Sequence, residues 1–389
     1  MSAEPIGRIR PGVTPARIKG WLWQGLLLFC VVGVTWFFAN NTSENLARKS
    51  LPFGFDFLGR TAGFDIPFKL VDWAVTNTYA RAVYVAILNT LLIAALSVVT
   101  ATLLGLLLGL LRLSSNWLAR TVSVGIIEAV RNTPQLVQIF FFYIAVLQTL
   151  PQARNSLTIS NVAFLNIRGL YLPTPVWGET AGITAFALLA CLIAAVALWH
   201  RRVWVKSTWR PAIGAVALIL PVMVLVAGWR SGAVAGFDVP QLRGFNFRGG
   251  VQIPPELMAL WFGLSVYTAA FIAEIVRGAM QGIVHGQTEA ALSLGLSRWQ
   301  TLKLVILPQA LRIIVPPLTS QYLNIIKSTS LGAGIAYPEV FQIVVGTVLN
   351  QSGHAIEVII IVMAFFLVIN LITSMFMNWY NRAIALKER

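Results

Sequence analysis

Long apolar runs separated by short polar stretches are the dominant pattern along the chain. A helix needs about 20 mostly apolar residues to cross the hydrocarbon core of a bilayer. Eight segments come close to or exceed that length: residues 21–39, 79–111, 122–150, 181–199, 211–229, 257–277, 312–335 and 357–378. The runs are too long and too continuously apolar for the strands of a membrane barrel. The pattern therefore predicts an all-α polytopic membrane protein with about eight transmembrane helices.

The composition supports a membrane location and narrows the kinds of partner. Hydrophobic residues make up 57% of the 389 residues and charged residues only 11%, whereas soluble domains carry about 25% charged residues. The formal net charge of +15 is typical of Lys and Arg retained on the cytoplasmic side of a membrane. We therefore expect the lipid bilayer, and no nucleic acid, as a partner. The two cysteines lie inside apolar runs and the three histidines lie far apart, so neither a disulfide nor a metal site is predicted, and no cofactor.

The distribution of basic residues predicts the orientation. If the N-terminus is cytoplasmic, the inside loops carry more Lys and Arg than the outside loops, and the short segment 200–210 holds several basic residues and no acid. An even number of spans then places both termini in the cytoplasm. The run 21–39 follows a basic segment, and no cleavage site of small residues comes after it. It is predicted to be a retained anchor helix.

Residues 285–309 form the most informative polar segment. We expect two short helices separated by Gly295, with Thr288 as the N-cap of the first. Ser297 and Gln300 have the spacing of a capping box for the second helix, and Pro308 should end regular helix before the next span. Such a helical elbow is either a surface for a partner or a compact loop that packs on its own bundle. Each outside loop is likewise either a surface for a partner or a segment that packs at the membrane surface. The outside loops are residues 40–78, 151–180 and 230–256.

The elbow resembles a known motif. Glu289-Ala290-Ala291, then Gly295, then Leu307-Pro308 is similar to the EAA motif of bacterial ABC-transporter permeases, with Val305 at the usual Ile position. The flanking stretches 273–278, 286–287, 327–331 and 131–134 resemble patterns of the polar amino-acid (His/Glu/Gln/Arg/opine) subfamily, although Asn132 and Ser328 depart from them. The chain is similar to the Q-type subunit of general or acidic L-amino-acid importers.

The resemblance implies a domain organisation. Residues 78–150 and 256–389 would form the five-helix core of a type I ABC importer permease, the second part carrying the coupling loop 285–309. Residues 1–77 would add a cytoplasmic tail, one further helix and a periplasmic loop. Residues 151–255 would be an insertion with two further helices.

The resemblance also implies a function. The chain would be a permease in the bacterial inner membrane that moves polar L-amino acids, acidic or neutral ones such as glutamate, glutamine and aspartate. It would not be an enzyme, because the sequence contains no G-x-x-x-x-G-K-[ST] phosphate-binding loop. Expected partners are ATP-binding cassette subunits, a second permease subunit and a periplasmic amino-acid-binding protein. The residues expected to couple transport to the ATP-binding subunit are Glu289, Ala290, Ala291, Gly295, Leu307 and Pro308. A secondary transporter and a non-transporting membrane scaffold are the alternatives.

Ionisable residues inside the spans are candidates for the substrate path, because buried charge in a membrane is costly. Glu128 with Arg131, and Glu274 with Arg277, have the i, i+3 spacing of ion pairs on one helix face. Either pair could instead be a local pair at the cytoplasmic rim. Lys327 has no acid nearby in its own segment. Thr133 and Pro134 resemble an N-cap and a first helical residue, which predicts a helix break at Asn132 and an exposed helix N-terminus for a substrate carboxylate. Gly105 and Gly109 have the spacing of a close helix contact.

Overall fold

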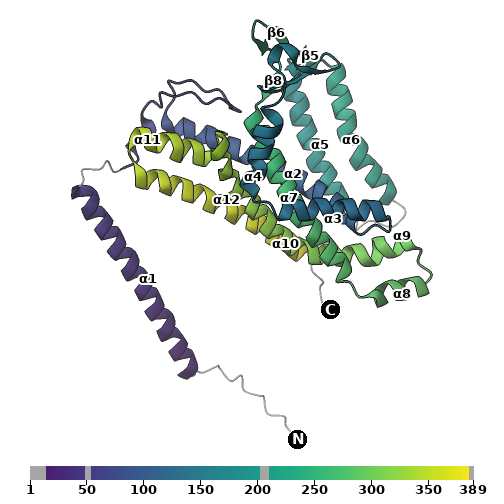
Figure 1. The fold of residues 1–389 in the computed structure, drawn as a ribbon. Helices are drawn as coiled ribbons and strands as arrows, with labels where there is room; N and C mark the ends of the chain where they lie inside the picture. The colour runs from purple at the N-terminus through teal and green to yellow at the C-terminus, as the bar shows by residue number, and fades with distance from the viewer. Residues whose placement is uncertain (1–14, 49–53, 202–209, 385–389) are drawn as a thin grey trace.

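The computed structural model describes residues 15–48, 54–201 and 210–384. Helices dominate this part of the chain (Figure 1). They are α1 (Pro15–Arg48), α2 (Tyr79–Arg112), α3 (Trp117–Arg131), α4 (Gln135–Phe140), α5 (Ala181–Arg201), α6 (Arg210–Arg230), α7 (Pro255–Gln281), α8 (His285–Ser293), α9 (Arg298–Thr301), α10 (Leu307–Ser328), α11 (Leu349–Ser352) and α12 (Ala355–Ile384).

Shorter helical turns extend several of these helices. π-helical segments follow α4 at Phe141–Leu147, follow α9 at Leu302–Ile306 and precede α11 at Phe341–Val348. Turns of 3-10 helix lie at Asp56–Gly59, Ala153–Asn155 and Thr329–Ile335, the last continuing α10.

Within the described residues, five helices are long and apolar enough to cross a membrane. They are Lys19–Phe38, Tyr79–Arg112, Pro255–Gln281, Arg298–Ile335 and Ala355–Ala383. Shorter apolar helices occupy Gln135–Leu147, Ala181–Ala195 and Gly214–Arg230. The mostly helical, multi-span architecture is thus confirmed. The basic segment 200–210, which carries part of the orientation argument, lies largely outside the described residues.

The predicted span 122–150 is not one helix. The amphipathic α3 ends at Arg131, and the chain turns at Asn132–Pro134 before α4 continues to Leu147 through a π-helical segment. Pro134 explains the interruption, since proline disfavours the helical conformation of the residue before it. Only the second part of this long run, with 13 residues at most, can therefore point along the bundle.

The expectation of an all-α protein is wrong for two loops. Eight short strands form a small platform at one end of the bundle (Figure 1). They are β1 (Leu157–Ile159), β2 (Ala163–Asn166), β3 (Gly169–Leu172), β4 (Thr174–Trp177), β5 (Val234–Asp238), β6 (Gln241–Arg243), β7 (Asn246–Arg248) and β8 (Val251–Ile253). One sheet has the order β1-β2-β3-β8, and β4 pairs with β5 and β6 with β7, all antiparallel. Strands of three to five residues give too short a pattern to be recognised from sequence.

The platform has its own small aromatic core. Tyr171 and Phe247 are buried, with ring centroids 4.9 Å apart, and Phe164 packs against them. The Tyr171 hydroxyl bonds with Asn246 Oδ1 at 2.9 Å. Burial raises the pKa of the Tyr171 hydroxyl, so this group stays protonated and donates to Asn246. Tyr171, Phe247 and Phe164 thus hold the platform together, whereas other aromatic side chains of the same loops, such as Trp177 and Phe245, are exposed.

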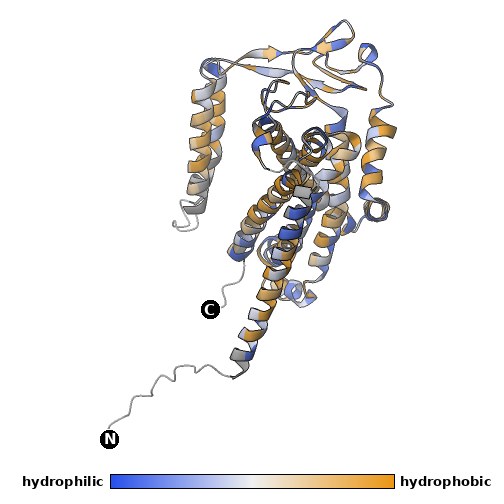
Figure 2. Cartoon of the chain, turned by 90° about the vertical axis from the view of Figure 1, so that its left-hand side faces the viewer, coloured by the Kyte–Doolittle hydropathy of each residue, from blue (hydrophilic) through white to orange (hydrophobic). Residues whose placement is uncertain are grey.

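Two parts of the chain stand apart from the central bundle. Helices α5 and α6 pack on each other and leave the platform as a separate pair (Figure 2). Helix α1 also stands away from the bundle in Figure 1, and its apolar side chains are exposed, such as Trp21 and Phe29. Apolar surface of this kind is suited to contact with lipid.

The centre of the bundle is the parallel contact of α2 with α7. Gly105 lies against Ile272 and Gly109 against Val276. A Cβ atom on Gly105 would lie 2.6 Å from Ile272 Cβ and 2.9 Å from the carbonyl oxygen of Ala269, which is too close for a real contact. The predicted close approach at these two glycines is therefore confirmed.

This contact makes a prediction for Gly105. Substitution Gly105→Ala should lower the free energy of unfolding by about 1–3 kcal/mol, because the added methyl group forces α2 away from α7. The matched control is Gly125→Ala in α3, where an added Cβ meets nothing within 4 Å. That change should be neutral or stabilise by up to about 1 kcal/mol, since Ala favours a helix over Gly. Unfolding of the purified protein by denaturing detergent measures both, and equal effects would contradict the close contact.

Candidate functional site: the helical elbow and the charged helix ends

The elbow of residues 285–309 is a pair of short helices that follows α7. Helix α8 ends at Ser293, and Gly295 takes a left-handed conformation with φ +77° that glycine adopts without strain. Helix α9 begins with the predicted capping box. The Ser297 Oγ accepts from the Gln300 amide at 3.3 Å, and the Gln300 side chain accepts from the Ser297 amide at 2.8 Å. The glycine turn and the capping box are both confirmed.

Two details of the elbow differ from the prediction. Thr288 is not an N-cap, because α8 already begins at His285, with Val284 as an N-cap that makes no side-chain bond. Pro308 does not end the helix, since the chain stays helical from α9 into α10. The π-helical turn Leu302–Ile306 comes directly before the proline. This wider turn gives room where a proline ring would collide with the carbonyl four residues earlier.

Much of the elbow surface is exposed. Glu289, Ala290 and Gly295 are exposed, whereas Ala291 is buried against the rest of the elbow. Leu294 and Trp299 have 82% and 68% of their surface exposed, which is unusual for large apolar side chains in polar surroundings. Leu307 and Pro308 are also exposed. A surface that combines a carboxylate with unpaired apolar side chains is typical of a contact with another protein.

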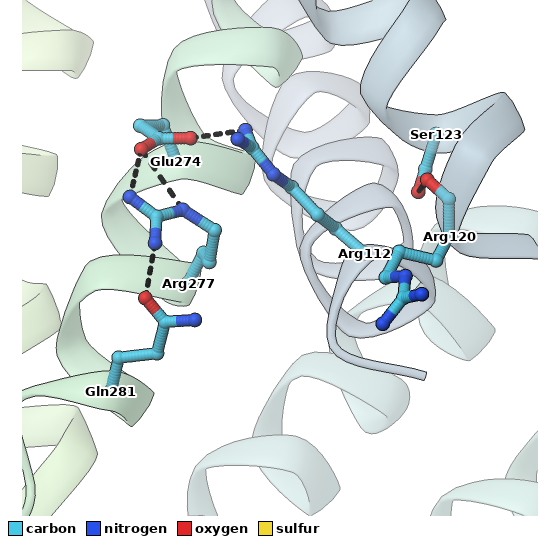
Figure 3. A network of polar contacts seen from close by, with 6 residues as sticks. All are labelled: Arg112, Arg120, Ser123, Glu274, Arg277 and Gln281. Carbon is cyan, nitrogen blue, oxygen red and sulfur yellow. Dashed lines mark hydrogen bonds and ion pairs between the residues drawn. The ribbon is translucent and has the colours of Figure 1, made fainter. Parts of the chain in front are cut away.

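A cluster of charged side chains lies above the elbow, where α2 and α7 approach their ends (Figure 3). The carboxylate of Glu274 forms ion pairs with both Arg277 and Arg112, and Arg277 also donates to Gln281. The second contact from Arg277, through Nε, is 3.0 Å long. The predicted pair Glu274–Arg277 is therefore confirmed, and Arg112 from α2 is an additional partner that the sequence pattern did not reveal.

The predicted pair of Glu128 with Arg131 does not form among the described residues. Arg131 instead lies over the ring of Phe271 in α7, 5.2 Å from its centroid. Both Glu128 and Arg131 are exposed. A cation is attracted to the face of an aromatic ring, and the turn that follows Arg131 directs its side chain toward α7 and not back along its own helix.

The break after α3 is stabilised by a residue that the sequence analysis missed. Gln138 is buried, and its amide donates to the Val130 carbonyl at 2.7 Å and to the Thr133 carbonyl at 3.1 Å. The predicted N-cap role of Thr133 is wrong, since its hydroxyl donates backward to Ala129 at 2.8 Å and α4 begins at Gln135. The break at Asn132 itself is confirmed. The polar residue Gln138 directly before the apolar run 139–147 was the available signal.

Lys327 is not near Arg131. It occupies the last turn of α10, is exposed, and leads into the 3-10 helix in which Gly332 packs on Leu260 near the platform end of α7. Arg131 lies over Phe271, eleven residues further along the same helix, which is about 16 Å of helix axis. Lys327 lies inside the candidate membrane span Arg298–Ile335, and its place in the substrate path stays a prediction.

Comparison with known proteins identifies the family. Residues 101–386 match the family described as binding-protein-dependent transport system inner membrane component. The chain belongs to this family and is a multi-pass inner-membrane component of a transport system, not an enzyme. A binding-protein-dependent system of this kind includes a binding protein and an ATP-hydrolysing subunit. The resemblance drawn from the elbow motif is thus confirmed.

Three relatives align over almost the whole chain. A putative amino-acid ABC transporter permease, YhdX of Escherichia coli (strain K12), is 48% identical over 96% of this chain and 95% of its own length. The general L-amino acid transport system permease AapQ of Rhizobium johnstonii is 44% identical over 98% and 96%. The glutamate/glutamine/aspartate/asparagine permease BztB of Rhodobacter capsulatus is 36% identical over 94% and 93%.

The charged cluster predicts a measurable coupling. Glu274→Gln should lower the free energy of unfolding by about 1–2 kcal/mol, because two partly buried arginines lose their counter-charge. Arg112→Gln should cost less once Glu274→Gln is present, with a coupling energy of at least about 0.5 kcal/mol. Unfolding of the single and double variants measures this coupling.

Glu128→Gln is the control for this cycle. Its carboxylate is exposed and forms no ion pair among the described residues, so its effect should stay within about 0.5 kcal/mol. Strictly additive effects of Arg112→Gln and Glu274→Gln would contradict the ion pair.

Proposed function

We propose that this chain is the permease subunit of an ABC importer that moves polar L-amino acids, acidic and neutral ones such as glutamate, glutamine and aspartate, into the cytoplasm. ATP is hydrolysed in a separate subunit. The observation that carries the proposal is the alignment over nearly the full chain with AapQ and BztB, whose names specify general L-amino acids and glutamate, glutamine, aspartate and asparagine. In this proposal the permease chain itself does not bind ATP.

This chain carries one elbow, so an importer with two ATP-binding subunits needs a second permease chain that carries another. Residues 78–150 and 256–389 are the five-helix importer core, and residues 1–77 and 151–255 add three helices and the outer loops. A second permease chain completes the channel, and two ATP-binding subunits bind on the elbow side. The binding protein docks on the platform side. Both chain termini are then cytoplasmic, as the basic loops favour.

The elbow is the proposed contact with the ATP-binding subunit. The exposed carboxylate of Glu289 supplies a charge for a basic partner group, and small residues at Ala290 and Gly295 permit close approach of two backbones. Ala291 fixes α8 against the elbow, and Leu307 with Pro308 joins the elbow to α10. Movement of the ATP-binding subunit is thereby transmitted into a transmembrane helix that has no break before Ser328.

The proposed substrate path has a surplus of positive charge on the elbow side. Arg112, Arg277 and Arg131 surround the single carboxylate of Glu274. Arg131 lies over the ring of Phe271 and forms no ion pair within the described part of the chain, so it can form a two-pronged contact with a carboxylate. Every amino acid carries an α-carboxylate, and the acidic ones carry two. Lys327, which lies closer to the platform, supplies a second cation that the substrate meets before it reaches Arg131. Thr133 and Glu128 flank Arg131.

Reconstitution in proteoliposomes tests the proposed function. The complete transporter with its binding protein should take up glutamate only when ATP is present. Glu289→Lys and Gly295→Trp should both lower uptake at least about tenfold while membrane insertion is unchanged, because charge reversal or added bulk blocks contact with the ATP-binding subunit. Uptake and ATP hydrolysis are measured on the same preparation.

A change of the same kind away from both proposed docking sides serves as a control. Gly25→Trp in α1, where the glycine has open space around it, should leave uptake intact. Uptake that follows a proton or sodium gradient without ATP would favour a secondary transporter. A chain that forms no complex and carries no solute would favour a membrane scaffold. Normal uptake by both elbow variants would contradict the coupling role.

The substrate path makes a separate prediction. Arg131→Gln should raise the KM for glutamate about tenfold or more, since a charge-assisted contact contributes about 1.5–3 kcal/mol. Lys327→Gln should have a smaller effect, because its side chain is exposed at a helix end. Arg382→Gln is the control, as Arg382 lies in the last turn of α12 and is exposed. If both variants carry glutamate with unchanged KM and rate, neither residue recognises the substrate.

A further inference from the structure

An open hollow of about 930 Å³ lies between the elbow and the end of the bundle. Four parts of the chain line it: the residue after α2, the end of α7, helix α8, and helix α9 with the π-helical turn that follows. This volume is at the upper end of the range for sites that bind small molecules and cofactors, about 300–1,000 Å³. None of the residues given a role in coupling or in the substrate path lines it.

The lining combines an apolar wall with cationic groups. Its apolar side chains come from every part of the hollow and include Leu113, Met280, Ile283, Leu302 and Ile306. Arg298 and the imidazole of His285 also line it, and of the lining residues in the described chain none is acidic. Arg298 forms no ion pair among the residues that the structure describes. The hollow thus offers a positive charge without a counter-charge beside a large apolar surface.

The hollow lies at the ends of two helices that are long enough to cross a membrane. Helices α2 and α7 end at Arg112 and Gln281, and the hollow is lined by residues at or directly after these ends. Both helices exceed the about 20 residues that cross a bilayer. A helix of this length reaches the headgroup region of a bilayer, where basic pockets between helices bind anionic lipids.

The two faces of α8 separate this hollow from the proposed contact with the ATP-binding subunit. His285, Thr288 and Leu292 face the hollow, with the i, i+3, i+7 spacing of one helix stripe. Glu289 does not line it and is exposed, and neither Leu294 nor Trp299 lines it. A ligand in the hollow and a protein on the outer face of the elbow can therefore bind at the same time.

We propose that the hollow binds one anionic phospholipid. The phosphate group contacts the guanidinium of Arg298, with His285 as a second donor, and an acyl chain lies along the apolar wall formed by Leu113, Ile306 and their neighbours. The lipid then bridges the end of α7 and the elbow and stiffens the connection between them. The inference rests on the chain being an inner-membrane component and does not depend on the proposed substrate.

Native mass spectrometry of the complete purified transporter tests the site. The complex is titrated in detergent with phosphatidylglycerol or with phosphatidylcholine, and bound lipid is counted. The unchanged protein should retain about fivefold more phosphatidylglycerol than phosphatidylcholine, the effect of one basic residue at a membrane surface. Arg298→Gln should remove this preference. Lys303→Gln is the matched control, since Lys303 is an exposed cation five residues away that does not line the hollow, and it should retain the preference.

Two results would overturn the proposal. Equal losses in Arg298→Gln and Lys303→Gln would show a diffuse attraction to surface charge instead of a site. Complete displacement of phosphatidylglycerol by millimolar glycerol phosphate would assign the hollow to a soluble anion, because the acyl chain would then contribute nothing. Lipid retention is measured without transport, so this experiment and the uptake assays fail independently of each other.

Discussion

The close contact of α2 with α7 is the constraint on which the other functional features depend. At Gly105 and Gly109 the two helices approach so closely that a single Cβ atom has no room. Because α2 and α7 run in the same direction, this contact brings the end of α2 beside the last turns of α7. Arg112 then reaches Glu274, although 162 residues separate them in the chain. The elbow begins only a few residues further on, so its position is also set by this contact.

The ion pairs at the helix ends have a different role from the glycine contact. A carboxylate held between two arginines leaves the cluster with net positive charge. An unpaired charge near the end of a membrane-spanning helix costs free energy. Each arginine without an acidic partner therefore needs another group to stabilise its charge. Arg131 uses an aromatic ring for this purpose. The same end of the bundle thus combines rigid packing with a positive electrostatic potential.

Features that depend on neighbouring residues could be predicted from the sequence. The apolar spans, the glycine turn at Gly295 and the capping box at Ser297 all follow from local spacing. Features that depend on distant pairing could not. The ion pair of Arg112 with Glu274 joins two helices, and β3 pairs with β8 across the whole α5–α6 hairpin. The N-cap roles assigned to Thr133 and Thr288 were wrong for two reasons. The Thr133 hydroxyl donates back to a carbonyl of the preceding helix. Thr288 lies inside a helix that already begins at His285.

The pairing of β3 with β8 has a consequence for how the chain is organised. Leu172 and Val251 are direct partners on adjacent antiparallel strands, so the chain leaves the core and returns to it at a single point. All of α5, α6 and strands β4 to β7 lie between these two residues. Insertions whose ends meet are tolerated because the surrounding fold does not have to open. A change in the length of the segment that carries α5 and α6 would therefore leave the pairing of Leu172 with Val251, and the helices on either side of it, where they are.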